Sequence, residues 1–152
     1  MSTEPVEQTG RLDNTVLVLT TGQGIVTGQH RIKWGENRRY EEAIRVPLYV
    51  RGPGIEPGSV LRAPVGNIDV PPTILELTGA AMPSDLARVV DGVSLVSELT
   101  EGADPSDRAL LIEGRGNVSR ARGGFAVRSY VGVRTERYAY VEHRRASVPT
   151  EA

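Results

Sequence analysis

The chain has 152 residues, of which 39% are hydrophobic and 24% charged, and its net charge is −1. This composition is ordinary for one globular domain, and the near-neutral charge gives no indication of a nucleic-acid or membrane-surface partner. The absence of cysteine excludes disulfides, thiolate metal sites and a cysteine nucleophile. The first ten residues are polar and no run of about 18 apolar residues occurs, so we expect no signal peptide or transmembrane helix and predict a cytoplasmic protein.

Two continuous apolar runs flank a polar, glycine-rich segment in the first third of the chain. They predict strands at residues 15–20 and 47–51, and neither run alternates apolar with polar residues. Such runs are typical of strands that are buried on both faces, as in a parallel sheet. Because ligands of these sheets bind in the loops after the strands, we expect any site chemistry between Thr20 and Arg39.

The remaining elements follow from local signals. Asp69 as N-cap, two prolines in the first turn and Gly79 as a stop predict a helix at residues 67–80. The other expected elements are a helical turn at 38–44, a turn at 52–58, a short strand at 59–65, a loop at 81–90, a short helix to Leu99, a turn at 102–107, a strand at 109–113, a basic loop at 114–124 containing Arg115, Arg120 and Arg122, and an antiparallel hairpin at 125–143.

The stretch from Asn14 to Pro53 resembles the sulfatases of the alkaline-phosphatase superfamily. That family reads Thr-Ser-Asp-Asn-Gly, Gly-x-His, Gly-Lys, Tyr-Glu-Glu and Arg-Val-Pro-Leu in this order. The corresponding residues here are Thr20-Thr21-Gly22-Gln23-Gly24, Gly28-Gln29-His30, Gly35-Glu36, Tyr40-Glu41-Glu42 and Arg45-Val46-Pro47-Leu48. Further similar motifs are Asn67 to Leu75, Asp91 to Leu95 and Val133 to Tyr138, so the resemblance covers roughly residues 10–142.

The resemblance implies an α/β fold. We expect a partial alkaline-phosphatase-like parallel or mixed sheet with flanking helices, plus a C-terminal antiparallel hairpin. Residues 1–152 would form a single truncated domain, with the core at 10–113 and the hairpin at 125–143. The family's N-terminal half, which carries the Asp-Asp metal ligands and the formylglycine segment, has no counterpart in this sequence.

Sulfatases hydrolyse sulfuric esters with a divalent cation, usually calcium, and a formylglycine nucleophile. Gly22 and Gln23 occupy the positions of the family's metal-binding Asp-Asn pair, and Glu36 occupies the position of its sulfate-contacting lysine. Calcium takes six to eight oxygen ligands, several of them anionic, so we expect no metal and no cofactor in this chain. No catalytic residue is predicted. The candidate substrate-binding residues are His30 and Lys33, and the alternative interpretation of His30 is a loop histidine held by a hydrogen bond.

Other polar residues have structural interpretations. We expect Arg45 to form an ion pair with Glu41 or Glu42, Asp69 to be structural, and His143 to lie on the surface.

Three functions stay open at this point. The chain could be a sulfatase-like fragment without catalysis, one half of a split sulfate- or phosphate-ester hydrolase, or a non-catalytic interaction module on the same scaffold. The partners to expect are a missing N-terminal half or a second copy that associates through an open sheet edge.

Overall fold

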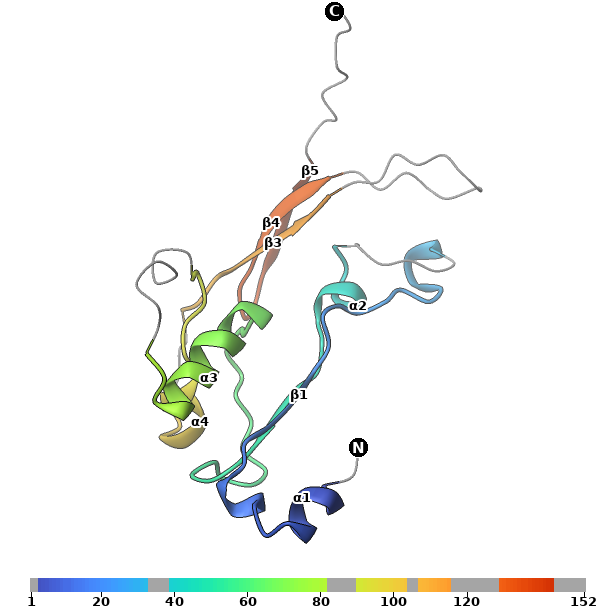
Figure 1. Cartoon of the computed structure of the whole chain (residues 1–152). Coiled ribbons are helices and arrows are strands. Elements are labelled where there is room, and N and C mark those ends of the chain that lie inside the picture. Colours follow the sequence, from blue (N-terminus) through green and yellow to red (C-terminus); the bar gives the residue numbers. More distant parts are fainter. Residues whose placement is uncertain (1–2, 33–38, 82–89, 104–106, 116–128, 144–152) are drawn as a thin grey trace, which may run out of the picture. The chain divides into compact units, whose positions relative to one another are not determined.

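The computed structural model describes residues 3–32, 39–81, 90–103, 107–115 and 129–143. They fall into two compact units, one drawn from Met1–Thr20 and Pro47–Asp107, the other from Thr21–Val46 and Arg108–Ala152. The elements in chain order, coloured along the sequence in Figure 1, are α1 (Glu4–Gln8), η1 (Leu12–Asn14), β1 (Leu17–Thr20), η2 (Gln29–Arg31), α2 (Glu41–Ile44), β2 (Leu48–Arg51), η3 (Asn67–Asp69), α3 (Val70–Thr78), α4 (Val96–Thr100), β3 (Leu110–Gly114), β4 (Tyr130–Arg134) and β5 (Ala139–His143). None of the described helices is long and apolar enough to cross a membrane.

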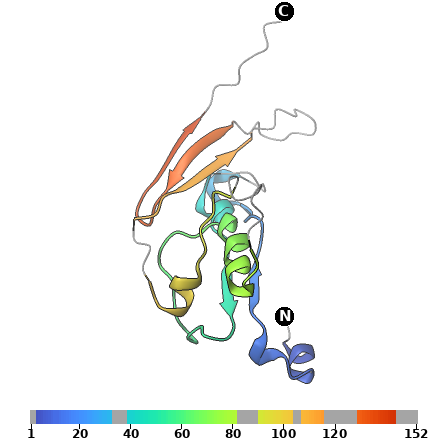
Figure 2. The same cartoon turned by 60° about the vertical axis from the view of Figure 1, so that its left-hand side comes forward.

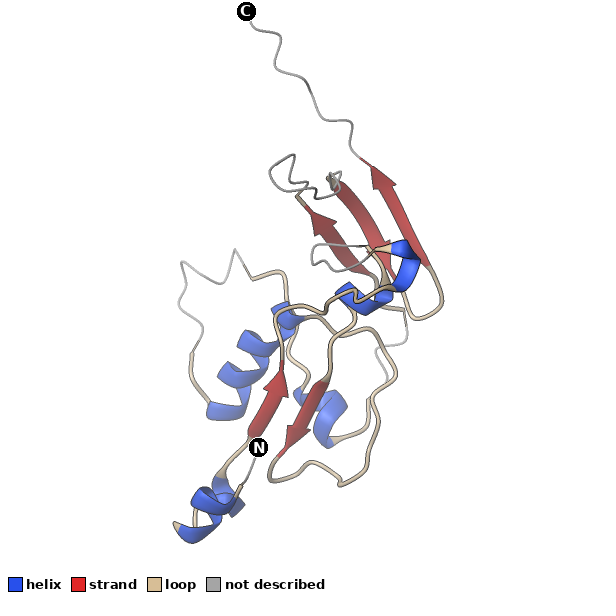
Figure 3. Ribbon diagram, turned by 90° about the vertical axis from the view of Figure 1, so that its right-hand side faces the viewer, coloured by secondary structure: helices blue, strands red, loops and turns tan. Residues whose placement is uncertain are grey.

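In the first unit, β1 and β2 form a two-stranded antiparallel sheet (Figure 3). Both strands were predicted, but their interpretation as parallel strands buried on both faces is wrong within the described part of the chain. Leu19 pairs with Tyr49, and the two side chains, which share one face, are 49% and 66% exposed. A continuous apolar run does not specify the direction of pairing, because both directions give the same alternation of side chains.

The clearest helix prediction is confirmed. A turn of 3-10 helix at Asn67–Asp69 leads into α3, and Gly79 ends α3 in the left-handed conformation with φ 66°. That conformation favours glycine, which lacks the Cβ atom that would crowd the carbonyl oxygen. The short helix that was expected next is α4, which packs against α3.

Asp69 and Thr73 tie the start of α3 to the segment before α4. The Asp69 side chain is fully buried, and its carboxylate accepts hydrogen bonds from the backbone N–H groups of Gly66 (2.7 Å) and Val93 (3.0 Å). The Thr73 hydroxyl accepts from the Leu95 N–H at 2.9 Å. Gly92 lies so close to the backbone of Ile68 that a Cβ atom at Gly92 would overlap the Ile68 carbonyl. Asp69 therefore stands at the N-cap position of α3, as predicted, but its side chain bonds these two amides instead of capping the helix.

The second unit contains a three-stranded antiparallel sheet in the order β3–β4–β5 (Figure 2). The strand and the hairpin were predicted, whereas the pairing of β3 with β4 was not. Tyr130 is buried against Gly114, where a Cβ atom would overlap the ring, and Gly132, two residues further along β4 on the same face, is also buried. The opposite face carries a row of exposed apolar residues, namely Leu111, Val133 and Tyr140.

Some predicted elements differ or fall outside the described residues. No strand forms at residues 59–65, where Val60 is exposed and the segment has no ladder partner among the described strands. Most of the loops at 81–90 and 114–124, and the start of the hairpin at 125–128, lie outside the described ranges. The described residues bury few apolar side chains; those classed as buried are Val26, Ala43, Ala63, Leu95 and Tyr130.

Candidate functional site

The loop after β1 is held against the segment that contains α2. The Gly24 N–H donates to the Ala43 carbonyl at 2.9 Å, and a Cβ atom at Gly24 would overlap the carbonyl of Glu42. Val26, two residues on, is fully buried. By contrast, nothing lies within 4 Å of a Cβ atom at Gly22, and its φ is not in the left-handed region. Glycine is thus required by packing at position 24 and not at position 22.

His30 is fixed by contacts on two sides. Its Nε2 lies 3.3 Å from Oε2 of Glu42, and its ring stacks on the Tyr40 ring with centroids 3.7 Å apart and planes 10° from parallel. Because a carboxylate only accepts, Nε2 carries the proton in this contact. The backbone at His30 and Arg31 is left-handed, with φ 55° and 60°, which is uncommon for residues other than glycine. The His30 side chain keeps 41% of its surface exposed.

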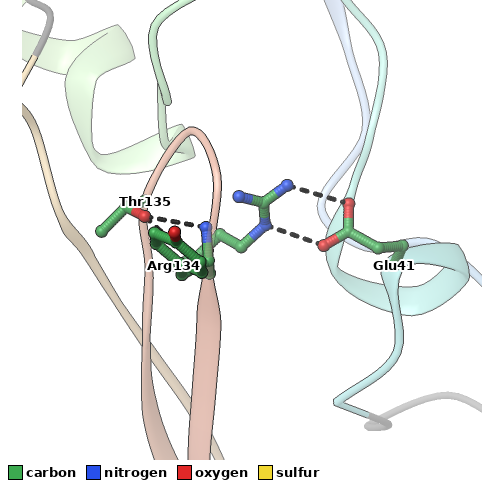
Figure 4. A network of polar contacts seen from close by, with 4 residues as sticks. Glu41, Arg134 and Thr135 are labelled. Atoms are coloured by element: carbon green, nitrogen blue, oxygen red, sulfur yellow. Dashed lines mark hydrogen bonds and ion pairs between the residues drawn. The ribbon is translucent and has the colours of Figure 1, made fainter.

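The two glutamates of α2 have different partners. Glu41 binds the guanidinium of Arg134 at the end of β4, with Nε at 2.8 Å from Oε1 and Nη2 at 3.5 Å from Oε2 (Figure 4). Glu42 takes His30 instead. Adjacent carboxylates that point apart cannot act as a catalytic pair. The expected ion pair of Arg45 is wrong, because among the described residues both glutamates bind other groups and Arg45 follows α2 in extended conformation.

Arg39 completes this group of side chains. Its Nη2 donates to the Tyr40 hydroxyl at 3.1 Å, and its guanidinium carbon lies 4.8 Å from the centre of the Tyr40 ring. Burial raises the pKa of the Tyr130 hydroxyl, and the positive charge of Arg39 partly offsets this rise. Tyr40 thus contacts two side chains, because its ring stacks on that of His30 and its hydroxyl and ring contact Arg39.

The residues present do not fit a calcium site. Gly22 has no side chain, and Gln23 supplies one neutral carbonyl where the cation needs several anionic oxygens. No group of three or more His, Cys, Asp or Glu side chains that could hold a metal occurs in the described part of the chain. Lys33 and Glu36 lie outside the described residues. His143 is exposed, as predicted.

The sequence indicated His30 as a candidate substrate-binding residue, but it did not indicate which residues contact His30. Tyr40 and Glu42 belong to a recognisable motif, yet nothing in their spacing from His30 indicated that they would contact its ring. Arg134 is 93 residues from Glu41, and no periodicity links the two. A pattern of paired charges in a single sequence does not identify such a contact.

Comparisons with known proteins give one consistent result. The sulfatase family model matches residues 3–80, just over half of the chain. The chain is 42% identical over 92 residues to human N-acetylglucosamine-6-sulfatase, a match that covers 60% of this chain and 16% of that protein. It is 42% identical over 83 residues to N-acetylglucosamine-6-O-sulfatase of Bacteroides thetaiotaomicron, covering 53% and 14%.

A solved structure confirms the fold class. The phosphonate monoester hydrolase of Silicibacter pomeroyi superposes with a TM-score of 0.75 at 30% identity, covering 93% of this chain and 29% of that one. The predicted partial α/β fold of the alkaline-phosphatase type is therefore correct. The chain spans under a fifth of the length of the two curated relatives and under a third of the solved chain. By the match over its first half, the chain belongs to the sulfatase family.

Proposed function

We propose that this chain forms the C-terminal part of a sulfatase-type domain and does not hydrolyse esters by itself. The observation that carries the proposal is the donor set after β1, where Gly22 and Gln23 offer one neutral oxygen. A sulfatase relies on a cation and on fixed positive groups to stabilise charge on the departing oxygen. Without a carboxylate at these positions the described residues offer no site that would hold calcium, and the chain has no cysteine from which a formylglycine could form, so neither is expected in it.

The position of His30 supports a second part of the proposal, that the chain still contacts an oxyanion through this residue. Its ring is held in one orientation by Glu42 and Tyr40 and is still partly open to solvent. The neighbouring carboxylate lowers the attraction for an anion, because the two charges largely cancel when the imidazole is protonated. We therefore expect weak binding of a sulfate or phosphate group and no turnover. Lys33, the other candidate, stays a prediction, as does the cytoplasmic location.

A second candidate function is one half of a split hydrolase that another chain completes. One observation favours it. The paired side chains of Leu19 and Tyr49 are about half and two-thirds exposed, and burying such a side chain fully stabilises by roughly 1.5–3 kcal/mol. A polypeptide that covers this face would bury the pair, and a second copy of the chain would cover the face in the same way.

Hydrolysis assays test the proposal directly. The purified chain is incubated with an aryl sulfate and with N-acetylglucosamine 6-sulfate, the second chosen from the names of the relatives, with and without calcium. We expect no turnover above that of a His30→Ala control. Calcium-dependent turnover above this control would refute the proposal that the chain is inactive alone.

Co-expression separates the two candidates. A polypeptide with the N-terminal part of a sulfatase fold, including a Cys-x-Pro-x-Arg segment, is expressed together with this chain. If the split-hydrolase candidate is correct, the two co-purify and the complex hydrolyses a sulfate ester. Without the second polypeptide we expect the chain to self-associate on size-exclusion chromatography, and Leu19→Lys should reduce that association. A sharp monomer peak with cooperative melting would contradict the exposed apolar face as an interface, and would favour the interaction-module alternative.

A further inference from the structure

The loop that carries His30 lacks the family's lysine, since Glu36 stands in its place. The described residues contain a different cation that contacts the same tyrosine as the histidine does. Arg39 lies three residues beyond Glu36 and immediately before Tyr40, whose ring stacks on His30. This brings a guanidinium and an imidazole onto one aromatic side chain.

Tyr40 positions Arg39 through two contacts. Its hydroxyl accepts a hydrogen bond from Nη2 at 3.1 Å, and its ring lies 4.8 Å from the guanidinium carbon. The first contact uses one of the five N–H donors of a guanidinium and leaves the others available. Arg39 is exposed at the surface. It is therefore both oriented and open to a ligand.

Among the described residues, no ion pair compensates the positive charge of Arg39. Glu41 pairs with Arg134, and Glu42 pairs with His30. In the part of the chain that the structure describes, the contacts of Arg39 are with the neutral Tyr40 alone. Its influence on the pKa of Tyr130 indicates that its field also acts on neighbouring groups.

We propose that Arg39, held by the tyrosine on which His30 stacks, is the cation with which this loop contacts a sulfate or phosphate monoester. The planar fork of a guanidinium suits two oxygens of a tetrahedral oxyanion, which a single ammonium group does not match. The proposal rests on the proposed function, because it assigns the residue that contacts the anion at the same site. Lys33, the candidate from the sequence, is the alternative with which the test below compares it.

An anion titration of the full chain tests this assignment. Inorganic sulfate, inorganic phosphate and an aryl sulfate are added separately, and the ring signals of His30 are followed by NMR. We expect saturable shifts in the wild type and an affinity about fivefold lower in Arg39→Gln, the size typical of losing one exposed charge contact. Arg45→Gln is the matched control, because Arg45 is also exposed, makes no ion pair with a described residue, and loses the same charge.

Two further variants make the result decisive. Arg39→Lys keeps the charge and should restore part of the affinity, which a purely structural role would not predict. Tyr40→Leu removes the platform and should weaken binding at least as much as Arg39→Gln. Far-UV circular dichroism and the dispersion of the His30 signals establish that each variant is folded.

Several outcomes would overturn the assignment. They are an absence of saturable shifts in the wild type, equal losses in Arg39→Gln and Arg45→Gln, and a larger loss in Lys33→Gln than in Arg39→Gln. These outcomes leave the hydrolysis assay unaffected. Turnover by the chain alone would instead overturn the proposed function, so the two failures are distinguishable.

Discussion

The most direct test of the structure concerns the buried carboxylate of Asp69. It accepts hydrogen bonds from two backbone N–H groups, those of Gly66 and Val93, and the second crosses 24 residues of sequence. Asp69→Ala removes both acceptors and leaves two partly buried donors without them. At about 1–1.5 kcal/mol for each lost bond, we expect a loss of about 2–3 kcal/mol in the free energy of unfolding.

The assay combines a global and a local measurement. Urea unfolding followed by far-UV circular dichroism gives the change in free energy, and hydrogen exchange gives the protection of the Val93 amide. Asp69→Asn retains one acceptor oxygen and should lose about half as much as Asp69→Ala. A stability within about 0.5 kcal/mol of the wild type, the spread of ordinary surface substitutions, together with unchanged protection at Val93, would refute the role given to this carboxylate.

Two threonines of the same helix provide a matched control. Thr73 is buried, and its hydroxyl accepts from the Leu95 N–H. Thr78 is exposed, and its hydroxyl donates only to the carbonyls of Ile74 and Leu75 in the preceding turn. Thr73→Val should therefore cost about 1–2 kcal/mol and Thr78→Val about zero, because only the first leaves an amide without its acceptor. Equal effects would show that the loss reflects helix propensity alone.

The remaining predictions concern the second unit and the loop after β1. Gly24→Ala should destabilise the chain by more than 1 kcal/mol, as overpacking of tight sites typically does, whereas Gly22→Asp should be nearly neutral. Thermal melts of the two variants compare these effects, and equal melting temperatures would contradict the packing at Gly24. A double-mutant cycle with Glu41→Gln and Arg134→Gln should give a coupling of about 0.5–1 kcal/mol, since the pair is partly exposed, and a coupling of zero would contradict the contact. Ultraviolet titration should show a tyrosine that ionises above the ordinary pKa of about 10, and Tyr130→Phe should remove that step. Because the folded state holds this proton more tightly, the contribution of Tyr130 to stability is fully present below pH 10 and is lost as the pH rises through the raised pKa; Arg39→Gln should raise that pKa further.

The sequence predicted those features that depend on local chemistry. Pro71, Pro72 and Gly79 specify the start and the end of α3, and alternating side chains specify the strands of the hairpin. The direction of the β1–β2 pairing was not predictable, because a short apolar run is compatible with either direction. The pairing of β3 with β4 depends on a meeting of distant segments, which neither segment encodes alone.

The candidate site shows the same division. The motif around His30 indicated a candidate anion-contacting residue and the absence of the oxygen ligands that a cation needs. It did not indicate the left-handed backbone at His30, because propensity disfavours that conformation for a residue with a side chain. The ion pair between Glu41 and Arg134 depends on how β4 meets α2 within the unit, so it is a property of the fold.

The left-handed residues His30 and Arg31 link the loop to α2 energetically. Such a conformation costs of the order of 1 kcal/mol for each residue, and it persists only while surrounding contacts over-determine it. Here those contacts are the ring of Tyr40 and the carboxylate of Glu42. If the turn of α2 frays, the imidazole loses its fixed orientation, so loop shape and helix order form a single equilibrium. By reciprocity, an oxyanion that prefers the ordered imidazole would also protect the amides of α2 from exchange.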